Sequence, residues 1–334
     1  MAYILAGDVG GTKTLLALYA HDRGVFAPLH EQTFASTQFP DLQSVARAFL
    51  APLGVAVQAA VFGVAGPVIG GTAQVTNLPW NIREEVLMET LGVPRVRLVN
   101  DLEAMATAVP LLREEDVVPL NDVTPTPCGP IGVIAPGTGL GEAFLVCVDG
   151  RYHPFPSEGG HADFAPGNEL ESELLRYLQR KFGRASYERV CSGSGIPNVY
   201  AFLRDCAYYR ESPYVAEQLN AAADPTPVIV ANALCDPPDP LCAKVLEIFT
   251  SVLAAKAGNL ALTIIATGGI YFGGGLPPRI LPLLQRESFM NIFRYKGRLS
   301  SLMMRIPAKV IVNTRAGLIG AAHLAFALAE AAGV

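Results

Sequence analysis

The chain has 334 residues, of which 51% are apolar and 16% charged, with 32 glycines and a net charge of −5. This length predicts two domains or lobes, and the apolar content excludes a disordered chain. The weak negative charge and the absence of Lys/Arg runs argue against nucleic acid or an anionic membrane as the main partner. An anionic small ligand would therefore need local backbone donors.

The cysteines form no CxxC pair, and no histidine pair has the spacing of a zinc site. We expect reduced thiols that act mostly as small core residues. The six positions are Cys128, Cys147, Cys191, Cys206, Cys235 and Cys242.

The N-terminal Met1-Ala2-Tyr3 leads directly into a strand without a signal-peptide pattern, so we expect a cytoplasmic protein. Two uncharged stretches, residues 55–82 and 257–278, are long enough to span a membrane. Gly, Pro, Gln or Asn interrupts both of them. Buried strands joined by glycine turns explain these stretches better, and we expect a soluble chain.

In chain order, strands precede and alternate with helices, which indicates an α/β layer fold. Short apolar runs predict strands at residues 3–6, 15–19, 59–64 and 96–99, and the last two have the pattern of buried strands. A further strand is expected at residues 31–34. Helical apolar spacing predicts helices, at residues 41–49 (with Asp41 as N-cap), 102–112, 170–182, 241–262 and 317–332. Residues 224–240, rich in Pro and Asp, are predicted to form a loop.

A unit of strand, glycine turn and strand occurs twice. The first turn is Gly7-Asp8-Val9-Gly10-Gly11-Thr12-Lys13-Thr14. The second unit spans residues 131–148 around Pro136-Gly137-Thr138-Gly139-Leu140-Gly141, after a proline-rich segment at 121–130 where we place the connection between lobes. A third glycine-rich passage lies at residues 267–275.

Glycine turns offer successive backbone N–H groups, which bind phosphate well. The hydroxyls of Thr12 and Thr14 add donors to the first turn, and Asp8 fits beside a polyphosphate only if Mg²⁺ lies between them. A Walker A loop would need glycine where Thr12 stands, and a dinucleotide-binding turn would need a helix next. For a single turn of this kind, a hairpin that binds no ligand remains an alternative. The recurrence of the glycine turn favours a phosphate ligand.

Several acidic residues could serve a ligand. Asn100-Asp101 follows a strand and precedes a helix, where α/β sheets bind ligands, although a capping box with Glu103 explains Asn100 at least as well. Glu158-Gly159-Gly160-His161 could be a surface turn, and it offers too few ligands for a metal. Glu188 has no local signal and could lie on a solvated helix face.

Together these segments resemble the bacterial glucokinase family, within the hexokinase and actin-like ATPase superfamily. The resemblance covers essentially the whole chain. The resemblance rests on six segments, each weak alone but specific in this order. They are residues 7–12, 98–104, 136–141, 158–164, 187–193 and 267–270.

The resemblance implies a two-lobed actin-like ATPase fold of the ribonuclease H-like type, in which each lobe is a mixed sheet with helices and a cleft separates the lobes. Residues 1–110 would form the small lobe, completed by a C-terminal helix at 313–334, and residues 111–312 the large lobe. It also implies phosphorylation of glucose at the 6-hydroxyl by ATP with Mg²⁺, a glycolytic reaction of the cytoplasm. Glucose and ATP would be the partners, without nucleic acid or membrane, and a homodimer is expected.

The resemblance further implies roles for single residues. Asp101 matches the catalytic base, and Asp8 would act on Mg²⁺ through water. The matching sugar-binding positions are Asn100, Asp101, Gly139, Glu158, His161 and Glu188. The matching nucleotide-binding positions are Gly7, Asp8, Val9, Gly10, Gly11, Thr12, Gly137, Thr138, Gly268 and Gly269. Lys13 and Pro136 depart from the family pattern, which leaves nucleotide affinity and lobe motion open.

Three alternatives remain. The first is a kinase for mannose, fructose or several hexoses. The second is a sugar-responsive repressor, which would need a DNA-binding domain before the first strand; its cysteine-rich zinc motif is also missing between Cys147 and Cys191. The third is a non-catalytic actin-like ATP switch, which leaves Glu158, His161 and Glu188 without a purpose.

Overall fold

The computed structural model describes residues 3–20, 25–75 and 78–331, and the chain divides into two compact units. Unit 1 comprises Met1–Asp116, Val148–Pro156 and Asn313–Val334, and unit 2 comprises Val117–Cys147 and Ser157–Val312. The proline-rich segment at 121–130 therefore lies inside unit 2. Two predictions fall partly outside the described residues. They are the N-terminal segment at Met1 and Ala2, and the end of the C-terminal helix at 332–334.

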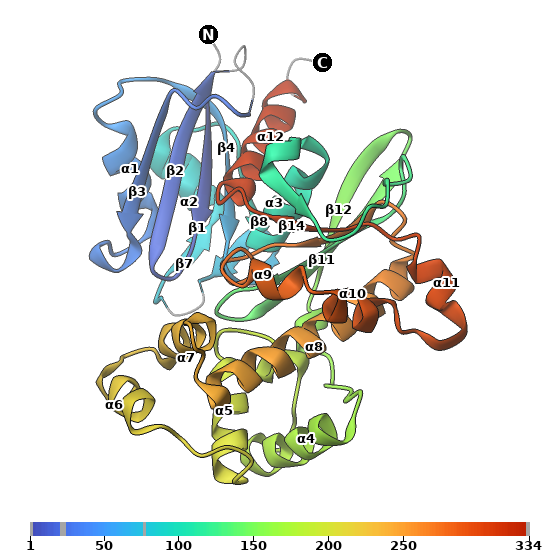
Figure 1. Cartoon of the computed structure of the whole chain (residues 1–334). Helices are drawn as coiled ribbons and strands as arrows, with labels where there is room; N and C mark the ends of the chain where they lie inside the picture. Colours follow the sequence, from blue (N-terminus) through green and yellow to red (C-terminus); the bar gives the residue numbers. More distant parts are fainter. Residues whose placement is uncertain (1–2, 21–24, 76–77, 332–334) are drawn as a thin grey trace. The chain divides into compact units, whose positions relative to one another are not determined.

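Unit 1 is built on a sheet with the strand order β3-β2-β1-β4-β8 (Figure 1). β1, β4 and β8 are parallel, whereas β2 and β3 are antiparallel to their neighbours. All five predicted strands of this region are confirmed. Their bounds are Tyr3–Val9 for β1, Lys13–Ala20 for β2, His30–Ala35 for β3, Val57–Val64 for β4 and Val96–Asn100 for β8.

Successive side chains of a strand point to opposite faces of the sheet, and in these strands both sets are largely apolar. Helices therefore cover both faces. α1 and α2 pack on one face with Leu5, Leu16 and Phe62, and α3 and α12 pack on the other with Ile4 and Tyr19. The helix bounds are Leu42–Leu50 for α1, Glu84–Leu91 for α2, Asp101–Ala108 for α3 and Ala316–Glu330 for α12. The predicted Asp41 N-cap of α1 is confirmed, since its Oδ1 accepts a hydrogen bond from Ser44 N at 2.8 Å.

The register of the parallel strands brings three chain segments to one edge. Val9 pairs with Val64, and Val64 pairs with Asn100, so β1, β4 and β8 end side by side. The first glycine turn and the start of α3 both follow directly at this edge, which is where α/β sheets bind ligands. Next to β8, a small sheet joins β5 (Val68–Ile69), β6 (Thr72–Gln74) and β7 (Asn81–Arg83).

Unit 2 contains a second mixed sheet, in which the strands follow the order β11-β10-β13-β14-β9. β10 and β11 form the predicted second hairpin, and β10, β13 and β14 run parallel. The bounds are Val117–Pro119 for β9, Ile131–Pro136 for β10, Leu140–Val148 for β11, Gly269–Phe272 for β13 and Ala308–Ile311 for β14. β12 (Arg151–Ser157) belongs mostly to unit 1.

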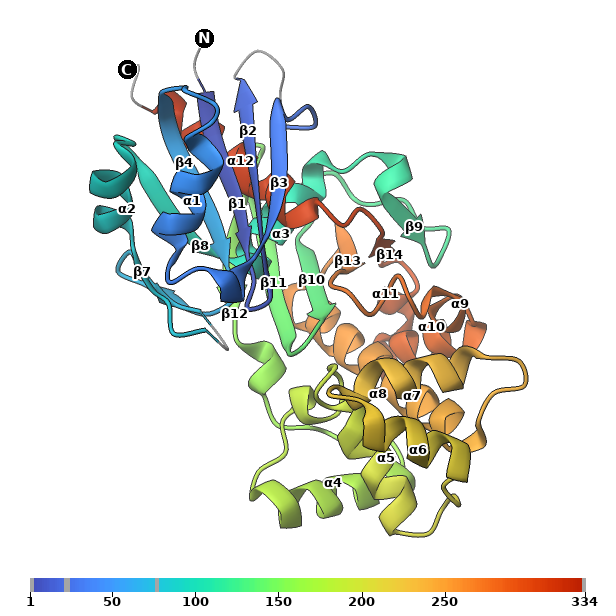
Figure 2. The same cartoon turned by 90° about the vertical axis from the view of Figure 1, so that its left-hand side faces the viewer.

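The helices of unit 2 gather around α8 (Pro240–Ile264), against which α5, α7 and α10 pack (Figure 2). The other bounds are Glu169–Phe182 for α4, Ile196–Asp205 for α5, Pro213–Ala221 for α6, Pro225–Leu234 for α7, Leu281–Leu284 for α9, Glu287–Arg294 for α10 and Ser300–Met303 for α11. The predicted helices at 170–182 and 241–262 are confirmed.

The loop predicted at 224–240 is wrong over its first half, where α7 stands. Asp224 is the N-cap of α7, since its Oδ1 accepts from Thr226 N at 2.9 Å, and Pro225 occupies the first helical position. Proline is favoured there because that N–H has no partner within the helix. The same residues that indicated a loop are therefore a helix start.

α8 is long and apolar enough to cross a membrane by length and composition. However, 67% of its most apolar window is buried inside the protein, and Val245, Phe249 and Val252 belong to the core of unit 2. These features are those of a core helix. The uncharged stretch at 257–278 thus combines the end of α8 with β13, rather than strands alone.

The expectation of reduced cysteines is wrong for one pair, because Cys128 and Cys147 form a disulfide with Cα atoms 5.2 Å apart. Cys128 precedes β10 and Cys147 lies near the end of β11, so the antiparallel pairing of these strands brings the two residues close together although 19 positions separate them. Cys191 and Cys242 are buried thiols, as expected, whereas Cys206 and Cys235 are exposed.

A buried carboxylate stands where the chain leaves unit 1. Asp116 accepts hydrogen bonds from Arg113 N at 2.9 Å, Arg113 Nε at 3.3 Å and Asn313 Nδ2 at 2.8 Å. Burial alone would raise the pKa of Asp116, but these hydrogen bonds outweigh it and hold the pKa below its ordinary value of 3.8. Asp116 thus ties together two segments of unit 1 that are distant in sequence.

We predict that Asp116→Ala lowers the free energy of unfolding at pH 7 by about 2–3 kcal/mol, because buried donors lose a charged acceptor. The folded-state pKa lies below the unfolded one, so the stabilisation is complete above the unfolded pKa and is lost as pH falls through the folded pKa. Urea unfolding of wild type and variant at pH 7 and pH 3 measures the difference, which should shrink at pH 3. An equal difference at both values would contradict the assignment.

Candidate active site

The first glycine turn is shorter than its sequence pattern suggested, because β1 continues through Gly7, Asp8 and Val9. The turn itself is Gly10-Gly11-Thr12, closed by a hydrogen bond from Gly10 N to Lys13 O at 2.9 Å. Ser36 supports it from the 3₁₀ helix η1 (Ser36–Gln38), donating from its N to Thr12 O at 3.0 Å and from its Oγ to Gly10 O at 2.8 Å.

Two residues of the predicted cradle have internal roles. A Cβ at Gly7 would lie 2.5 Å from Phe62 Cδ1, so glycine is needed there to pack β1 against β4. The Thr14 hydroxyl is buried and lies 3.0 Å from Ser36 Oγ, so it supports the turn rather than facing a ligand. No local sequence pattern marks Ser36, so its role could not be predicted from the sequence.

Asp8 lies at the carboxyl end of β1, beside the first turn of α12. A Cβ at Gly317 would lie 3.3 Å from Asp8 Oδ2, so this glycine leaves room next to the carboxylate. Burial raises the pKa of Asp8 to about 6, and among the described residues no basic side chain offsets it. The described residues also contain no group of three His, Cys, Asp or Glu that could hold a metal. Asp8 is thus a partly buried carboxylate that a bound cation would stabilise.

Asn100 and Asp101 begin α3 at the same edge. Asn100 Oδ1 accepts from Leu102 N at 2.9 Å, its Nδ2 donates to Gly66 O at 3.0 Å, and Glu103 accepts from the Asn100 N–H. The capping-box interpretation is therefore confirmed. The side chain of Asn100 is thereby held in one orientation.

Asp101 Oδ1 also accepts from Leu102 N, at 2.9 Å. A Cβ at Gly63 would lie 3.6 Å from Asp101 Cα and 3.7 Å from Gly7 O, so the start of α3 lies close to β1 across this glycine. Unit 1 therefore places Asp8, Asn100 and Asp101 at one edge of its sheet.

The second turn, Gly137-Thr138-Gly139, is closed by a hydrogen bond from Gly137 N to Gly139 O at 2.9 Å. Its carbonyls are held by a loop, since Gly193 N donates to Gly137 O at 2.7 Å and Ser194 N donates to Thr138 O at 3.1 Å. Buried Thr226 of α7 supports that loop through a 2.8 Å hydrogen bond to Gly193 O. Both turns are thus fixed by segments that the hairpin pattern does not contain.

Glu188 is held against the second turn. It lies in the 3₁₀ helix η5 (Tyr187–Arg189), and its Oε2 accepts from Leu140 N at 2.9 Å. A Cβ at Gly139 would lie 2.5 Å from this oxygen, so only glycine allows the approach. The solvated helix face considered for Glu188 is wrong, because the fold brings a distant segment onto its carboxylate.

His161 joins Glu158 and Glu188 into one cluster. His161 Nε2 lies 3.9 Å from Glu158 Oε2 and 3.9 Å from Glu188 Oε2. The side chains of Glu158 and His161 are 71% and 56% exposed, so they can reach a ligand in solvent. Unit 2 therefore brings together three predicted sugar-binding residues beside Gly139, as directed donors and acceptors for hydroxyl groups.

The glycines between Glu158 and His161 let their segment lie on β11. A Cβ at Gly160 would lie 1.9 Å from Leu140 O, and a Cβ at Gly159 would lie 2.1 Å from Glu142 Oε2. Neither side chain could be accommodated without moving the 3₁₀ helix η4 (Gly159–His161). The buried carboxylate of Glu142 has no signal in the hairpin pattern, so its position could not be predicted from the sequence.

The third glycine passage divides in two. Gly268 and Gly269 lie at the amino end of β13, where a Cβ at Gly268 would lie 2.3 Å from Gly129 O, so they have a packing role there. Gly273 and Gly274 follow the carboxyl end of β13. Gly273 N donates to Ile134 O at 2.9 Å, and a Cβ at Gly274 would lie 2.8 Å from Pro136 O. The latter pair is the one beside the second turn.

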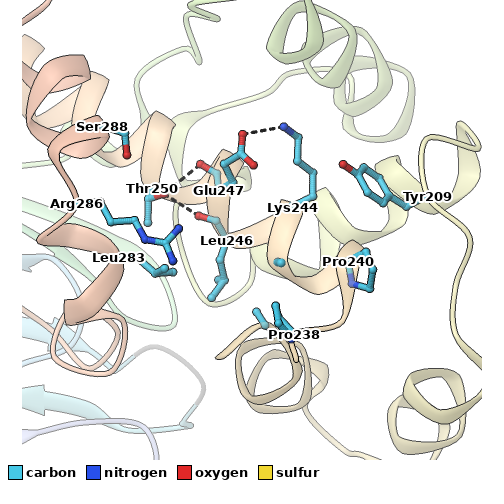
Figure 3. Close-up of a pocket in the computed structure, with 12 residues that line it drawn as sticks. Tyr209, Pro238, Pro240, Lys244, Leu246, Glu247, Thr250, Leu283, Arg286 and Ser288 are labelled. Atoms are coloured by element: carbon cyan, nitrogen blue, oxygen red, sulfur yellow. Dashed lines mark hydrogen bonds and ion pairs between the residues drawn. The ribbon is translucent and has the colours of Figure 1, made fainter. Parts of the chain in front are cut away.

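A pocket of about 390 Å³ opens elsewhere in unit 2, between α7, α8 and α10 (Figure 3). None of the predicted site residues lines it. Lys244 pairs with Glu247 at 2.8 Å, and the Thr250 hydroxyl donates to Leu246 O at 2.8 Å. These polar groups are thus already paired within the protein, and the pocket is separate from the candidate site.

The fold and these residues define the chain as a two-lobed sugar kinase of the actin-like ATPase type. A family model described as Glucokinase matches residues 5–328. A glucokinase of Nostoc punctiforme is 42% identical over 336 residues, which cover 96% of this chain and 98% of the relative. The chain therefore belongs to the glucokinase family.

Solved structures agree with this membership. The crystal structure of a glucokinase from an Antarctic psychrotroph matches with a TM-score of 0.81 and 28% identity, covering 97% of this chain and 99% of that one. The glucokinase of Balamuthia mandrillaris in complex with glucose matches with a TM-score of 0.82 and 25% identity, covering 97% of this chain and 93% of that one.

We predict that Gly160→Ala lowers the melting temperature by about 5 °C or more, because its Cβ would collide with the Leu140 carbonyl. Gly275→Ala is the matched control, since a Cβ there meets nothing within 4 Å. Differential scanning calorimetry of both variants checks this expectation. Equal melting temperatures for Gly160→Ala and wild type would mean that η4 does not lie on Leu140 as described.

Proposed function

We propose that this protein transfers the γ-phosphoryl group of ATP to the 6-hydroxyl of glucose, giving glucose 6-phosphate and ADP. The observation that carries the proposal is the cluster of Glu158, His161 and Glu188 beside the second glycine turn, in a chain of the glucokinase family. The cluster offers a sugar several hydrogen-bonding groups next to a turn suited to phosphate.

The sugar is held by its hydroxyls. Glu158 and Glu188 accept hydrogen bonds from them, and His161 can donate or accept. Glu188 is already fixed to Leu140 N, so its remaining acceptor capacity has a defined direction. Asn100 would contribute through the groups that capping leaves available. A site of this kind rejects an analogue that lacks a hydroxyl, because its own polar groups would remain unpaired.

Asp101 is the proposed catalytic base. The 6-hydroxyl oxygen attacks the γ-phosphorus, the bond from that phosphorus to the β–γ bridging oxygen breaks, and ADP leaves while the hydroxyl proton passes to Asp101. Because the transition state is loose, Asp101 mainly orients the hydroxyl and takes its proton late. Its hydrogen bond with Leu102 N fixes the carboxylate at the start of α3.

The turns Gly10–Thr12 and Gly137–Gly139 are the proposed phosphate sites, with the backbone N–H groups that turn closure does not use as donors. Gly273 and Gly274 are better placed than Gly268 and Gly269 to approach the nucleotide, because they lie beside the second turn. Asp8 fits Mg²⁺ held through water, since its partly buried carboxylate has no cationic partner among the described residues. Bound Mg²⁺ would neutralise phosphate charge.

We further expect a cytoplasmic enzyme that acts as a homodimer. Steady-state kinetics with glucose, mannose and fructose distinguish glucose specificity from a broader hexose kinase. ATP turnover that does not respond to any hexose would favour the non-catalytic switch instead.

We predict that Asp101→Ala lowers kcat by ~10² or more, because the hydroxyl loses its base, while glucose binding remains measurable. A coupled assay of ADP release gives kcat, and calorimetry gives the glucose affinity. An unchanged kcat would remove Asp101 from the role of base.

We predict that Glu158→Gln weakens glucose binding by roughly tenfold or more and ATP binding far less, because an amide replaces a charged acceptor of sugar hydroxyls. Calorimetric titration with each substrate measures both affinities. Glu169→Gln, which changes an exposed carboxylate at the start of α4, is the control. Equal losses for glucose and ATP would contradict a sugar-binding role.

A further inference from the structure

A buried ion pair lies behind the Glu158, His161 and Glu188 cluster. Glu142 of β11 and Lys256 of α8 approach to 3.0 Å, with side chains only 2% and 10% exposed. The Lys256 ammonium is the charged partner of Glu142 Oε1. Because two charges are costly to bury, such a pair is an expensive way to fill a core. Nothing in the proposed reaction uses either residue directly.

Glu142 contacts the first of two segments that carry the cluster. Its Oε2 occupies the space that a Cβ at Gly159 would take, 2.1 Å from that ideal position. Gly159 follows Glu158 directly and begins η4, which ends at His161. The carboxylate therefore forms part of the surface on which Glu158 and His161 are placed.

Lys256 contacts the second segment. Its ammonium lies 4.9 Å from the centre of the Tyr187 ring, a cation–π distance, and Tyr187 precedes Glu188 in η5. The Tyr187 hydroxyl accepts a hydrogen bond from Asn259 Nδ2 at 3.2 Å, and its ring meets Phe164 edge-on. One face of α8 thus holds the segment that carries Glu188.

We propose that the Glu142–Lys256 ion pair is a positioning element for sugar binding, which sets Glu158 and His161 relative to Glu188. The pair contacts one segment through Gly159 and the other through Tyr187. Neither residue touches the sugar, so both act through the groups they support. This proposal rests on the proposed function, because it concerns the same sugar-binding cluster.

The test compares Glu142→Gln, Lys256→Met and the double variant with wild type. Each single variant leaves one buried charge unpaired and should lower the melting temperature, whereas the double variant removes both charges and should recover part of it. In all three variants the KM for glucose should rise, and the calorimetric affinity for glucose should fall, by about tenfold or more, because small displacements of binding groups have large effects. The KM for ATP should change less than about threefold.

The double variant separates positioning from stability. Recovered stability without recovered glucose affinity supports the proposal. Glucose affinity that returns to the wild-type value together with the melting temperature overturns it, since the pair would then matter only for folding. If the single variants do not fold, the double variant alone decides between these two results.

Lys244→Met on the same helix is the control, because it also breaks a Lys–Glu ion pair, but one whose carboxylate, Glu247, is 69% exposed. It should leave both KM values unchanged. Lys256→Arg, which keeps the charge, should retain more glucose affinity than Lys256→Met. A wild-type protein that forms no ADP with glucose refutes the proposed function, whereas an active wild type with unchanged glucose KM in the variants refutes only the positioning role.

Discussion

The hydrogen bond from Leu140 N to Glu188 Oε2 is the interaction on which the candidate site of unit 2 depends. It joins the end of a glycine turn to a carboxylate 48 positions later in the chain, and a bond to a charged acceptor is stronger than one between neutral groups. The proposed phosphate-binding turn and a proposed sugar-binding residue are thereby fixed to one another. His161 and Glu158 complete the cluster at 3.9 Å spacings.

Glycine enables these approaches through the absence of a side chain rather than through flexibility. At Gly139, Gly159 and Gly160 an added Cβ would meet Glu188, Glu142 and the Leu140 carbonyl at 2.5 Å or less. The backbone φ at none of these three positions lies in the left-handed region. Close packing of three segments around the start of β11 therefore requires the glycines, and a motif that resembles a flexible turn is part of a rigid arrangement.

Unit 1 follows a different physical rule, the convergence of parallel strand ends. β1, β4 and β8 finish in register, so Asp8 and Asp101 come to the same edge although 92 intervening residues separate them in the sequence. Burial of Asp8 with no cationic partner among the described residues raises its pKa to about 6. An edge with such a carboxylate favours a cationic ligand, which agrees with the magnesium-bound nucleotide of the proposed reaction.

The sequence by itself determined the five strands of the unit 1 sheet, the two hairpins, the longest helices and the family, because periodicity, capping and glycine turns are local properties. Asp41 and Asn100 are N-caps as their positions indicated. The pattern misjudged α7, where a helix start has the composition of a loop.

Only the tertiary structure decided which distant groups meet. It placed Ser36 under the first turn, Thr226 behind the second, Glu188 on Leu140 and Lys256 on Glu142, and it joined Cys128 to Cys147. Local periodicity carries no information on these contacts, because each depends on how separate elements pack.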